Sequence, residues 1–309
     1  MKKTLALLLT TLLISSCSFK ITEKMALMDL QPKYKIKEYR ESTQKDSTLT
    51  NLQKVARINQ ADTIAQSKKE EIFADDSLKI NRKYFNPNDS ITLEYFVFTP
   101  IKANKTIYYF IGNLESIFDI LDNLKTLSKA TNAKIFLLHY RGYGNSNGAI
   151  SFKTQFNDNT NFYQYTQPEI VGTKIAIGYS LGSVYATYLG VENKFDEIVL
   201  VSPFSNTKDM ITNIKRNNLR GSKIFMRPFL SITADDYLMK LSNSQKMTTY
   251  TNKLLIMHAI DDNTLAYPMG KHLFKMSKSK DKELITLETG GHGAAFQSKN
   301  WNTLIGKLK

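Results

Sequence analysis

Residues 174–190 read "KIAIGYSLGSVYATYLG" and join a strand pattern to a helix pattern through a sharp turn. The apolar run before Gly178 is typical of a buried strand, and the residues after Gly182 have helical spacing. Ser180 stands between these glycines in a G-x-S-x-G motif. A strained strand-to-helix turn of this kind exposes a serine hydroxyl, and its glycines leave room for the close approach of strand and helix. The stretch predicts Ser180 as a nucleophile; a serine that simply begins a helix is the alternative.

A second stretch, "GNSNG" at 144–148, fits the same motif around Ser146. It follows a strand pattern, but the glycines and asparagines of "GYGNSNGAISF" lead into no helix pattern. This stretch is typical of a loop. We therefore expect Ser146 to be a loop serine without a catalytic role.

A serine nucleophile needs a base to take its proton and an acid to orient the base. The chain has four histidines, and His292 lies in "ETGGHGAAF", a glycine-rich loop directly after the last predicted strand. That setting lets an imidazole reach a neighbouring strand end. The stretch "HAIDDNTL" follows the penultimate strand and offers Asp261 and Asp262 as the acid. The residues alone leave the choice between these two acids open.

The strand and helix patterns alternate along the chain after about residue 78. Segments 77–85 and 90–100, separated by "NPND", predict an antiparallel hairpin. Further strands are expected at 105–112, 133–140, 174–179, 195–204, 252–260 and 282–291, and helices at 115–132, 181–193, 272–278 and 296–308. Continuous apolar strands between helices predict an α/β fold with a mostly parallel sheet covered on both faces. Active sites in such sheets lie at the carboxyl ends of the strands.

Several motifs together resemble those of the α/β-hydrolase superfamily over residues 78–309. They are "YYFIGNLESI", "YRGYGNSNG", "GYSLGSVYA", "VSPFS", "LLIMHAIDDNTLAYP" and "GGH". The resemblance is closest to the serine hydrolases that include monoacylglycerol-lipase-like and depalmitoylase-like proteins and bacterial relatives. It implies an α/β-hydrolase fold with a helical cap inserted at about 204–252. Caps shape the acyl or leaving-group pocket, and the apolar residues Ile211, Ile214, Phe225 and Phe229 could line that pocket or form the cap's own core.

The resemblance also implies roles for individual residues. The acid that matches the family's pattern is Asp262, which is therefore preferred to Asp261. The order Ser180, Asp262, His292 along the chain is that of α/β-hydrolases. Two backbone N–H groups would form the oxyanion hole: that of Leu181, after the nucleophile, and that of Asn113, with Leu114 as the alternative.

Three positions depart from the family's pattern. Ile111 stands where the family has a histidine before its oxyanion glycine, Ala259 replaces a glycine of the acid loop, and His139 replaces an aspartate. None of the three belongs to the expected triad. Arg141, in the Arg-Gly-Tyr-Gly loop, is interpreted as a structural ion-pair residue.

The expected reaction is acyl transfer to water through a covalent acyl-enzyme, with a small acyl ester, thioester or lipid-like substrate. No metal and no cofactor are implied. A peptidase of the same superfamily is the alternative enzyme. A non-catalytic, lipid-anchored binding or scaffold protein on the same fold is the alternative from another class.

The N-terminus, "MKKTLALLLTTLLISSCSFK", has two lysines, a short apolar run and small residues before Cys17. This pattern is typical of a signal peptide, since the run is too short to span a membrane. The stretch "ISSC" resembles the lipobox of bacterial lipoproteins. It predicts cleavage after residue 16, lipidation of Cys17 and export to the bacterial cell envelope as a membrane-anchored lipoprotein; a plain signal peptide is the alternative. Residues 17–75 are expected to be a polar tether that could form a short helix at 48–58 and pack in part on the domain, and 76–309 the hydrolase domain.

Cys17 is the only cysteine of the chain, which excludes disulfides within one chain and a cysteine-based metal site. The formal net charge is +14. Nucleic acid is a poor partner for an exported lipoprotein, so the favoured interpretation is a solvated basic face. Attraction to anionic lipid headgroups or to an anionic substrate is the alternative.

Overall fold

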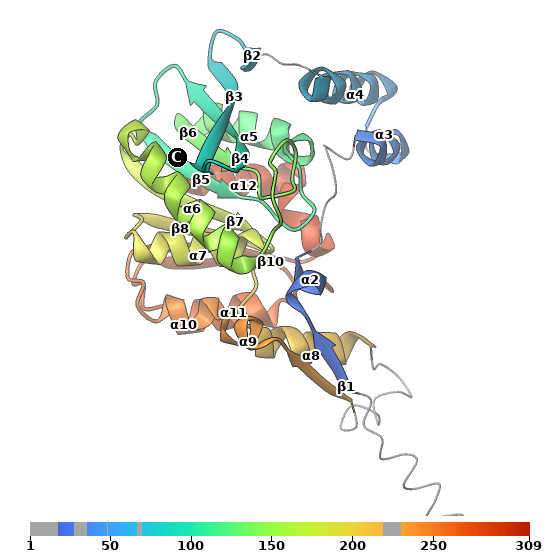
Figure 1. Ribbon diagram of the computed structural model, residues 1–309, viewed down its shortest axis with the longest axis vertical. Coiled ribbons are helices and arrows are strands. Elements are labelled where there is room, and N and C mark those ends of the chain that lie inside the picture. Colours follow the sequence, from blue (N-terminus) through green and yellow to red (C-terminus); the bar gives the residue numbers. More distant parts are fainter. Residues whose placement is uncertain (1–17, 28–35, 48, 67–69, 219–229) are drawn as a thin grey trace, which may run out of the picture.

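Nine strands form the central sheet in the computed structural model, which describes residues 18–27, 36–47, 49–66, 70–218 and 230–309. Helices cover both faces of this sheet (Figure 1). In their order across the sheet, the strands are β11 (Lys282–Leu287), β10 (Lys253–Ala259), β8 (Glu197–Val201), β7 (Thr173–Tyr179), β5 (Lys105–Phe110), β6 (Ala133–Leu138), β4 (Ile91–Pro100), β3 (Leu78–Asn88) and β2 (Glu71–Ala74). The fold is that of an α/β-hydrolase, as the sequence predicted.

The sheet has a parallel part and an antiparallel edge. The strands from β11 to β6 are parallel, whereas β4, β3 and β2 are antiparallel to their neighbours. The predicted hairpin is β3 paired with β4. Every residue of β8 is buried, as expected for a strand with helices on both faces.

Two layers of helices enclose the sheet. In Figure 1, α6 and α7 lie in front of it, and α5 and α12 lie behind it. The helices of the main domain are α5 (Ile117–Thr131), α6 (Phe152–Thr166), α7 (Gly182–Glu192), α10 (Asn243–Met247), α11 (Pro268–Met276) and α12 (Ser298–Leu308), with short 3-10 turns η1 (Gln167–Glu169) and η3 (Gly291–Phe296). Helix α5 confirms the prediction made from the spacing of apolar residues, because these residues are buried on one face of the helix.

Helix α6 is a difference from the sequence analysis, which expected no helix after the second G-x-S-x-G stretch. The loop ends as expected, but α6 begins at Phe152, directly after Ser151. Ser151 and Thr154 form a reciprocal capping box, which satisfies backbone donors at the helix start. Because α6 is rich in Asn, Thr and aromatic residues, its helical propensity is low and much of its stability comes from packing.

The segment expected to be a polar tether, 17–75, has ordered structure in its described parts. It contains β1 (Ser18–Ile21), α2 (Glu23–Ala26), α3 (Ile36–Lys45) and α4 (Asn51–Gln66). Strand β1 pairs in parallel with β9 (Ser231–Ala234) of the cap. Ile21 and Leu27 are buried in the hydrophobic core, and burial of each such side chain contributes about 1.5–3 kcal/mol. Scattered apolar residues of this polar segment therefore pack in the hydrophobic core of the domain.

The cap insertion contributes α8 (Thr207–Asn218), β9 and α9 (Asp236–Lys240), whereas α10, which also falls in 204–252, packs on α7 of the main domain. Of the apolar cap residues, Phe225 and Phe229 lie outside the described residues, as do the predicted signal peptide and Cys17. Within the described ranges, no helix has both the length and the apolar character that crossing a bilayer requires.

Candidate active site

Ser180 lies in the turn between β7 and α7 with a backbone φ of +52°, a left-handed conformation that costs a non-glycine residue on the order of 1–3 kcal/mol. The two glycines of the motif permit this turn. A Cβ on Gly182 would lie 2.0 Å from the Phe110 carbonyl oxygen, and one on Gly178 would lie 2.5 Å from the Gly182 oxygen. The close packing predicted for this motif is therefore present.

The structure brings Ser180, His292 and Asp262 into one hydrogen-bonded chain. Ser180 Oγ is 2.8 Å from His292 Nε2, and His292 Nδ1 is 2.8 Å from Asp262 Oδ2. An ionised carboxylate can only accept a hydrogen bond, so Nδ1 of His292 carries the proton. Nε2 of the neutral imidazole is then free to accept the proton of the serine hydroxyl.

Asp262 is buried and fully satisfied. Its Oδ1 accepts hydrogen bonds from the backbone N–H groups of Thr264 and Leu265, and its Oδ2 also lies 3.2 Å from His258 Nε2. Burial alone would raise the pKa of Asp262, but the hydrogen bonds from His258 and His292 outweigh it and hold the pKa well below its usual range. The carboxylate therefore remains charged opposite His292.

Asp261 points to different partners from its neighbour. Its two carboxylate oxygens accept hydrogen bonds from the backbone N–H groups of Gly290 and Gly291, at 3.1 and 2.8 Å. Both glycines have positive φ values, 113° and 64°, which favour glycine. Asp261 therefore fixes the turn that precedes His292 without touching the imidazole in this structure.

Two further residues support His292 and were not singled out from the sequence. The Ser202 hydroxyl donates to the backbone oxygen of His292 at 2.8 Å, and the Tyr179 ring lies 5.2 Å from the imidazole ring. Ser202 follows β8 and has a positive φ of 45°. The "VSPFS" match was the sequence signal for this position, because it marks a strand end at the same edge of the sheet.

The loop after β5 faces Ser180: a Cβ on Gly112 would lie 3.6 Å from Ser180 Cβ. Within this loop, the N–H of Gly112 donates to Glu115 and that of Leu114 donates to the Tyr143 hydroxyl. The N–H of Asn113 has no acceptor among the described residues, and neither has that of Leu181 after the nucleophile. These two N–H groups are therefore available as donors near the serine, whereas that of Leu114 is occupied, which favours Asn113 over Leu114 as the oxyanion donor.

Tyrosines of the Arg-Gly-Tyr-Gly loop brace this region where the family's histidine is missing. The hydroxyl of Tyr140 donates to the backbone oxygen of Ile111 at 2.7 Å, and that of Tyr143 donates to Asn113 Oδ1 at 3.0 Å. Glu115, which accepts the hydrogen bond from Gly112 in the same loop, is buried, and its burial raises its pKa to about 8. The loop is thus held by neighbours that lie 25 or more residues further along the chain.

An apolar cavity of about 280 Å³ opens beside Ser180. Its walls come from the main domain, the cap and the N-terminal segment: Ala26, Asn113, Phe152, Ser180, Leu181, Val184, Phe204, Thr207, Met210, Ile214, Leu238, Leu241, Thr264 and Leu265. Ile214 of α8 is therefore one of the predicted cap residues that line the pocket, whereas Ile211 packs against the hydrophobic core. The lining suits an acyl chain or another apolar group.

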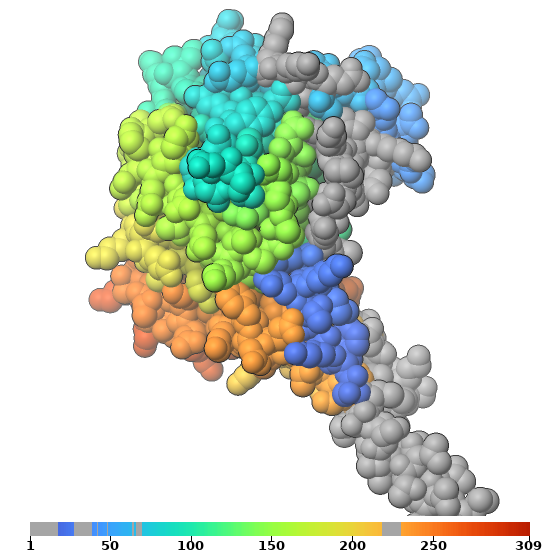
Figure 2. All heavy atoms as spheres, in the orientation of Figure 1, coloured from blue at the N-terminus to red at the C-terminus, as the bar shows by residue number. Residues whose placement is uncertain are grey.

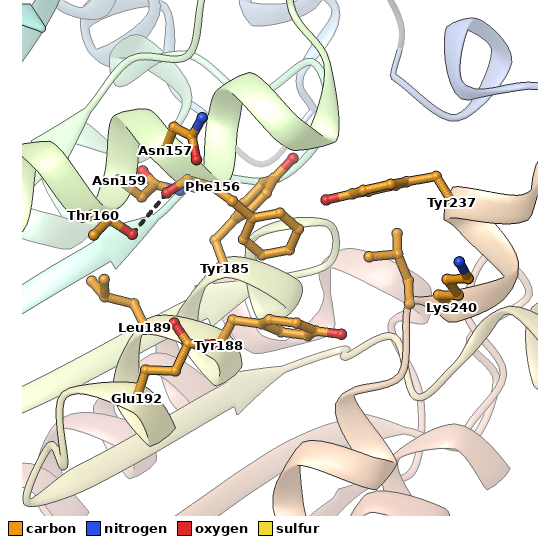
Figure 3. Close-up of a pocket in the computed structure, with 11 residues that line it drawn as sticks. Phe156, Asn157, Asn159, Thr160, Tyr185, Tyr188, Leu189, Glu192, Tyr237 and Lys240 are labelled. Carbon is orange, nitrogen blue, oxygen red and sulfur yellow. Dashed lines mark hydrogen bonds between the residues drawn. The ribbon is translucent and has the colours of Figure 1, made fainter.

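A second cavity, of about 390 Å³, lies between α6, α7 and α9 (Figure 3). Leu241 borders both cavities, so the two are neighbours. Figure 3 shows the rings of Phe156, Tyr185, Tyr188 and Tyr237 around it, with Lys240 at one side. None of the triad residues lines the second cavity, which distinguishes it from the candidate active site.

Arg141 forms a bidentate ion pair with Asp158 of α6, at 2.7 and 2.9 Å. Its interpretation as a structural residue is confirmed. His139, which replaces the family's aspartate, is buried with its Nδ1 3.0 Å from Glu94 Oε2. Both side chains hold the loop that carries Ser146.

No protein-family model matches the chain. Among curated proteins it is 27% identical to Protein ABHD12B of Homo sapiens over 196 residues, which cover 60% of this chain and 54% of the relative. It is also 27% identical to the lysophosphatidylserine lipase ABHD12 of Danio rerio over 167 residues, covering 51% of this chain and 41% of the relative. The chain spans about half the length of the curated relatives it matches.

Among solved structures, the Pyrococcus furiosus esterase Pf2001 aligns with a TM-score of 0.59 and 14% sequence identity, covering 75% of this chain and 89% of that chain. This likeness shows a shared fold.

Proposed function

We propose that the chain is a serine hydrolase that cleaves an ester or thioester through Ser180, His292 and Asp262. The observation that carries this proposal is the continuous hydrogen bonding from Ser180 Oγ through His292 to Asp262 beside an apolar cavity. Similarity to esterases and to a lysophosphatidylserine lipase supports hydrolysis over a binding or scaffold role.

The geometry accounts for each step of acyl transfer. His292 Nε2 takes the proton of the Ser180 hydroxyl as Oγ attacks the carbonyl carbon, and the negative Asp262 stabilises the imidazolium. The N–H groups of Asn113 and Leu181 receive the oxyanion. His292 then protonates the leaving alkoxide or thiolate. Water, deprotonated by the same imidazole, releases the acid from the acyl-enzyme and returns Ser180.

The cavity next to Ser180 supports the proposed substrate class. Most of its lining residues are apolar, which suits a small acyl ester or a lipid-like ester. The relatives' printed names point the same way, since one is a lipase for lysophosphatidylserine and a fold neighbour is an esterase. We propose no metal and no cofactor for the reaction.

A fluorophosphonate probe tests the proposed mechanism, because it modifies only a serine that its neighbours have activated. We expect the purified protein to be labelled and to hydrolyse p-nitrophenyl esters. A parallel assay with p-nitroanilides distinguishes an esterase from a peptidase. Folded protein that neither takes the label nor cleaves any ester would make the scaffold alternative the better one.

We also propose that Cys17 is lipidated and holds the chain to the membrane of a bacterial cell envelope. The motif "ISSC" supports this, and several acyl chains anchor a protein where one is marginal. Expressed in a bacterial host, the wild-type protein should partition into the Triton X-114 detergent phase, and Cys17→Ser should not. Wild-type protein found wholly in the aqueous phase would contradict the anchor.

A further inference from the structure

The segment that directly follows Cys17 is attached to the cap. All four residues of β1 pair with β9, from Ser18 opposite Ser231 to Ile21 opposite Ala234. The backbone N–H of Glu23 donates to Asp235 Oδ2 at 3.1 Å, and Lys20 forms an ion pair with the same carboxylate. In Figure 2 this segment, in blue, lies against the orange residues of the cap.

The same segment also contacts α6 of the main domain. Glu23 Oε1 accepts a hydrogen bond from the backbone N–H of Phe152, the first residue of that helix, at 2.5 Å. A carboxylate at a helix N-terminus is favoured by the helix dipole and by the unpaired N–H groups there. Phe152 itself lines the cavity beside Ser180.

A third contact reaches the loop that faces the nucleophile. The backbone oxygen of Ala26 accepts a hydrogen bond from Asn113 Nδ2 at 3.2 Å, while Asn113 Oδ1 accepts one from Tyr143. The Asn113 side chain is therefore held from two sides, one of which is the N-terminal segment. Ala26 also lines the cavity. Two other residues of the same segment, Ile21 and Leu27, are buried.

We propose that Ala26, which the segment Ser18–Leu27 holds at the cavity, forms part of the wall of the acyl pocket and is a specificity-determining residue for acyl-chain length. The inference rests on the proposed esterase function. The small side chain of Ala26 leaves the space that an acyl chain longer than acetate would occupy. The substrate class that fits is an ester with a medium or long acyl chain.

The connection to the chain's N-terminus is short, so the proposed lipid on Cys17 would place the pocket near a membrane. Cys17 is bonded to Ser18, and nine residues of fully extended chain span at most about 30 Å. A lipid on Cys17 would therefore keep the pocket within about that distance of the bilayer surface.

Enlarging Ala26 tests the inference. We compare kcat/KM for p-nitrophenyl octanoate with that for p-nitrophenyl acetate in full-length wild type, Ala26→Val and Ala26→Phe. The octanoate-to-acetate ratio should fall by at least about tenfold in Ala26→Phe and by less in Ala26→Val, since added volume removes room for the longer chain. Loss of stability alone would lower both activities together and leave the ratio unchanged.

Met25 provides the matched control. It is the preceding residue, and its side chain is 51% exposed, so Met25→Phe adds a ring outside the pocket and should keep the wild-type ratio. An unchanged ratio in both Ala26 variants would overturn the inference while leaving the esterase proposal intact. Wild-type protein inactive on both esters would instead overturn the proposed function.

Discussion

Two loops of this protein contain the same G-x-S-x-G motif, and their serines have opposite surroundings. Ser180 presents Oγ to His292 Nε2 from a turn with positive φ. Ser146 is buried: its Oγ donates to the backbone oxygen of His139 and accepts from the backbone N–H of Glu94. The Ser146 hydroxyl therefore links the backbone of β4 to that of the residue that follows β6. The motif specifies a tight turn in both loops, and only the partner of the hydroxyl separates a candidate nucleophile from a structural link.

The largest expected difference between the loops is in activity. Ser180→Ala should abolish fluorophosphonate labelling and lower kcat by on the order of 10⁶-fold, because the nucleophile is lost. Ser146→Ala should keep its labelling and most of its ester hydrolysis. Full labelling of the Ser180→Ala protein would reverse the assignment of the two loops.

The two adjacent acids, Asp261 and Asp262, should differ in how much their substitution lowers kcat. Asp262→Asn should lower kcat by roughly 10⁴-fold, because a neutral amide cannot stabilise the imidazolium and favours the wrong tautomer. Asp261→Asn should cost less than about tenfold, since it weakens the contacts to Gly290 and Gly291 but leaves the imidazole's partner in place.

Circular dichroism should show both aspartate variants folded, so that the kinetic comparison concerns the site alone. A larger loss of activity in Asp261→Asn than in Asp262→Asn would mean that the acid is assigned one position too late.

The Ser146 loop and the loop after β5, which faces Ser180, each contain a hydrogen bond to a buried acid, and these two acids differ in their partners. Glu94 is bonded to His139 and Asn145, whereas Glu115 accepts a hydrogen bond from the N–H of Gly112 and its burial raises its pKa to about 8. The folded state thus keeps a proton on Glu115 that the unfolded chain, with a pKa of 4.5, releases. Protonated Glu115 therefore contributes to the free energy of unfolding in full below pH 4.5, and this contribution is lost as the pH rises toward 8.

Glu115→Gln should remove the loss of stability at high pH, because the amide does not ionise and its oxygen can still accept the hydrogen bond from the N–H of Gly112. We expect a melting temperature several degrees above wild type at pH 8.5 and close to wild type at pH 5. An equal shift at both pH values would show that ionisation of Glu115 is not the cause.

The smallest expected effect is on stability in the Ser146 loop. Ser146→Ala leaves the buried N–H of Glu94 without its acceptor, which should cost about 1–3 kcal/mol in the free energy of unfolding, measured with denaturant. Ser151→Ala, at the cap of α6, serves as a nearby reference of about 1 kcal/mol. Unaltered stability in Ser146→Ala would weaken the structural role assigned to this hydroxyl.

The sequence by itself determined the main elements of the fold. Apolar runs predicted the parallel strands, helical spacing predicted α5, α7 and α12, and the elbow predicted where β7 ends and α7 begins. Chain order and strand ends then singled out Ser180, His292 and two adjacent acids. These features are readable because they depend on periodicity and on steric limits at single positions, which are properties of a short stretch of chain.

Tertiary structure decided what short stretches do not encode. Only the fold directs Asp262 to the imidazole and Asp261 to the glycine turn, and only packing makes the polar residues of α6 a helix. The same holds for Ala26, which reaches a cavity that Ser180, more than 150 residues away, also lines. Which side chains meet across the chain depends on the packing of whole layers, so local patterns predicted the catalytic candidates but not the walls and supports around them.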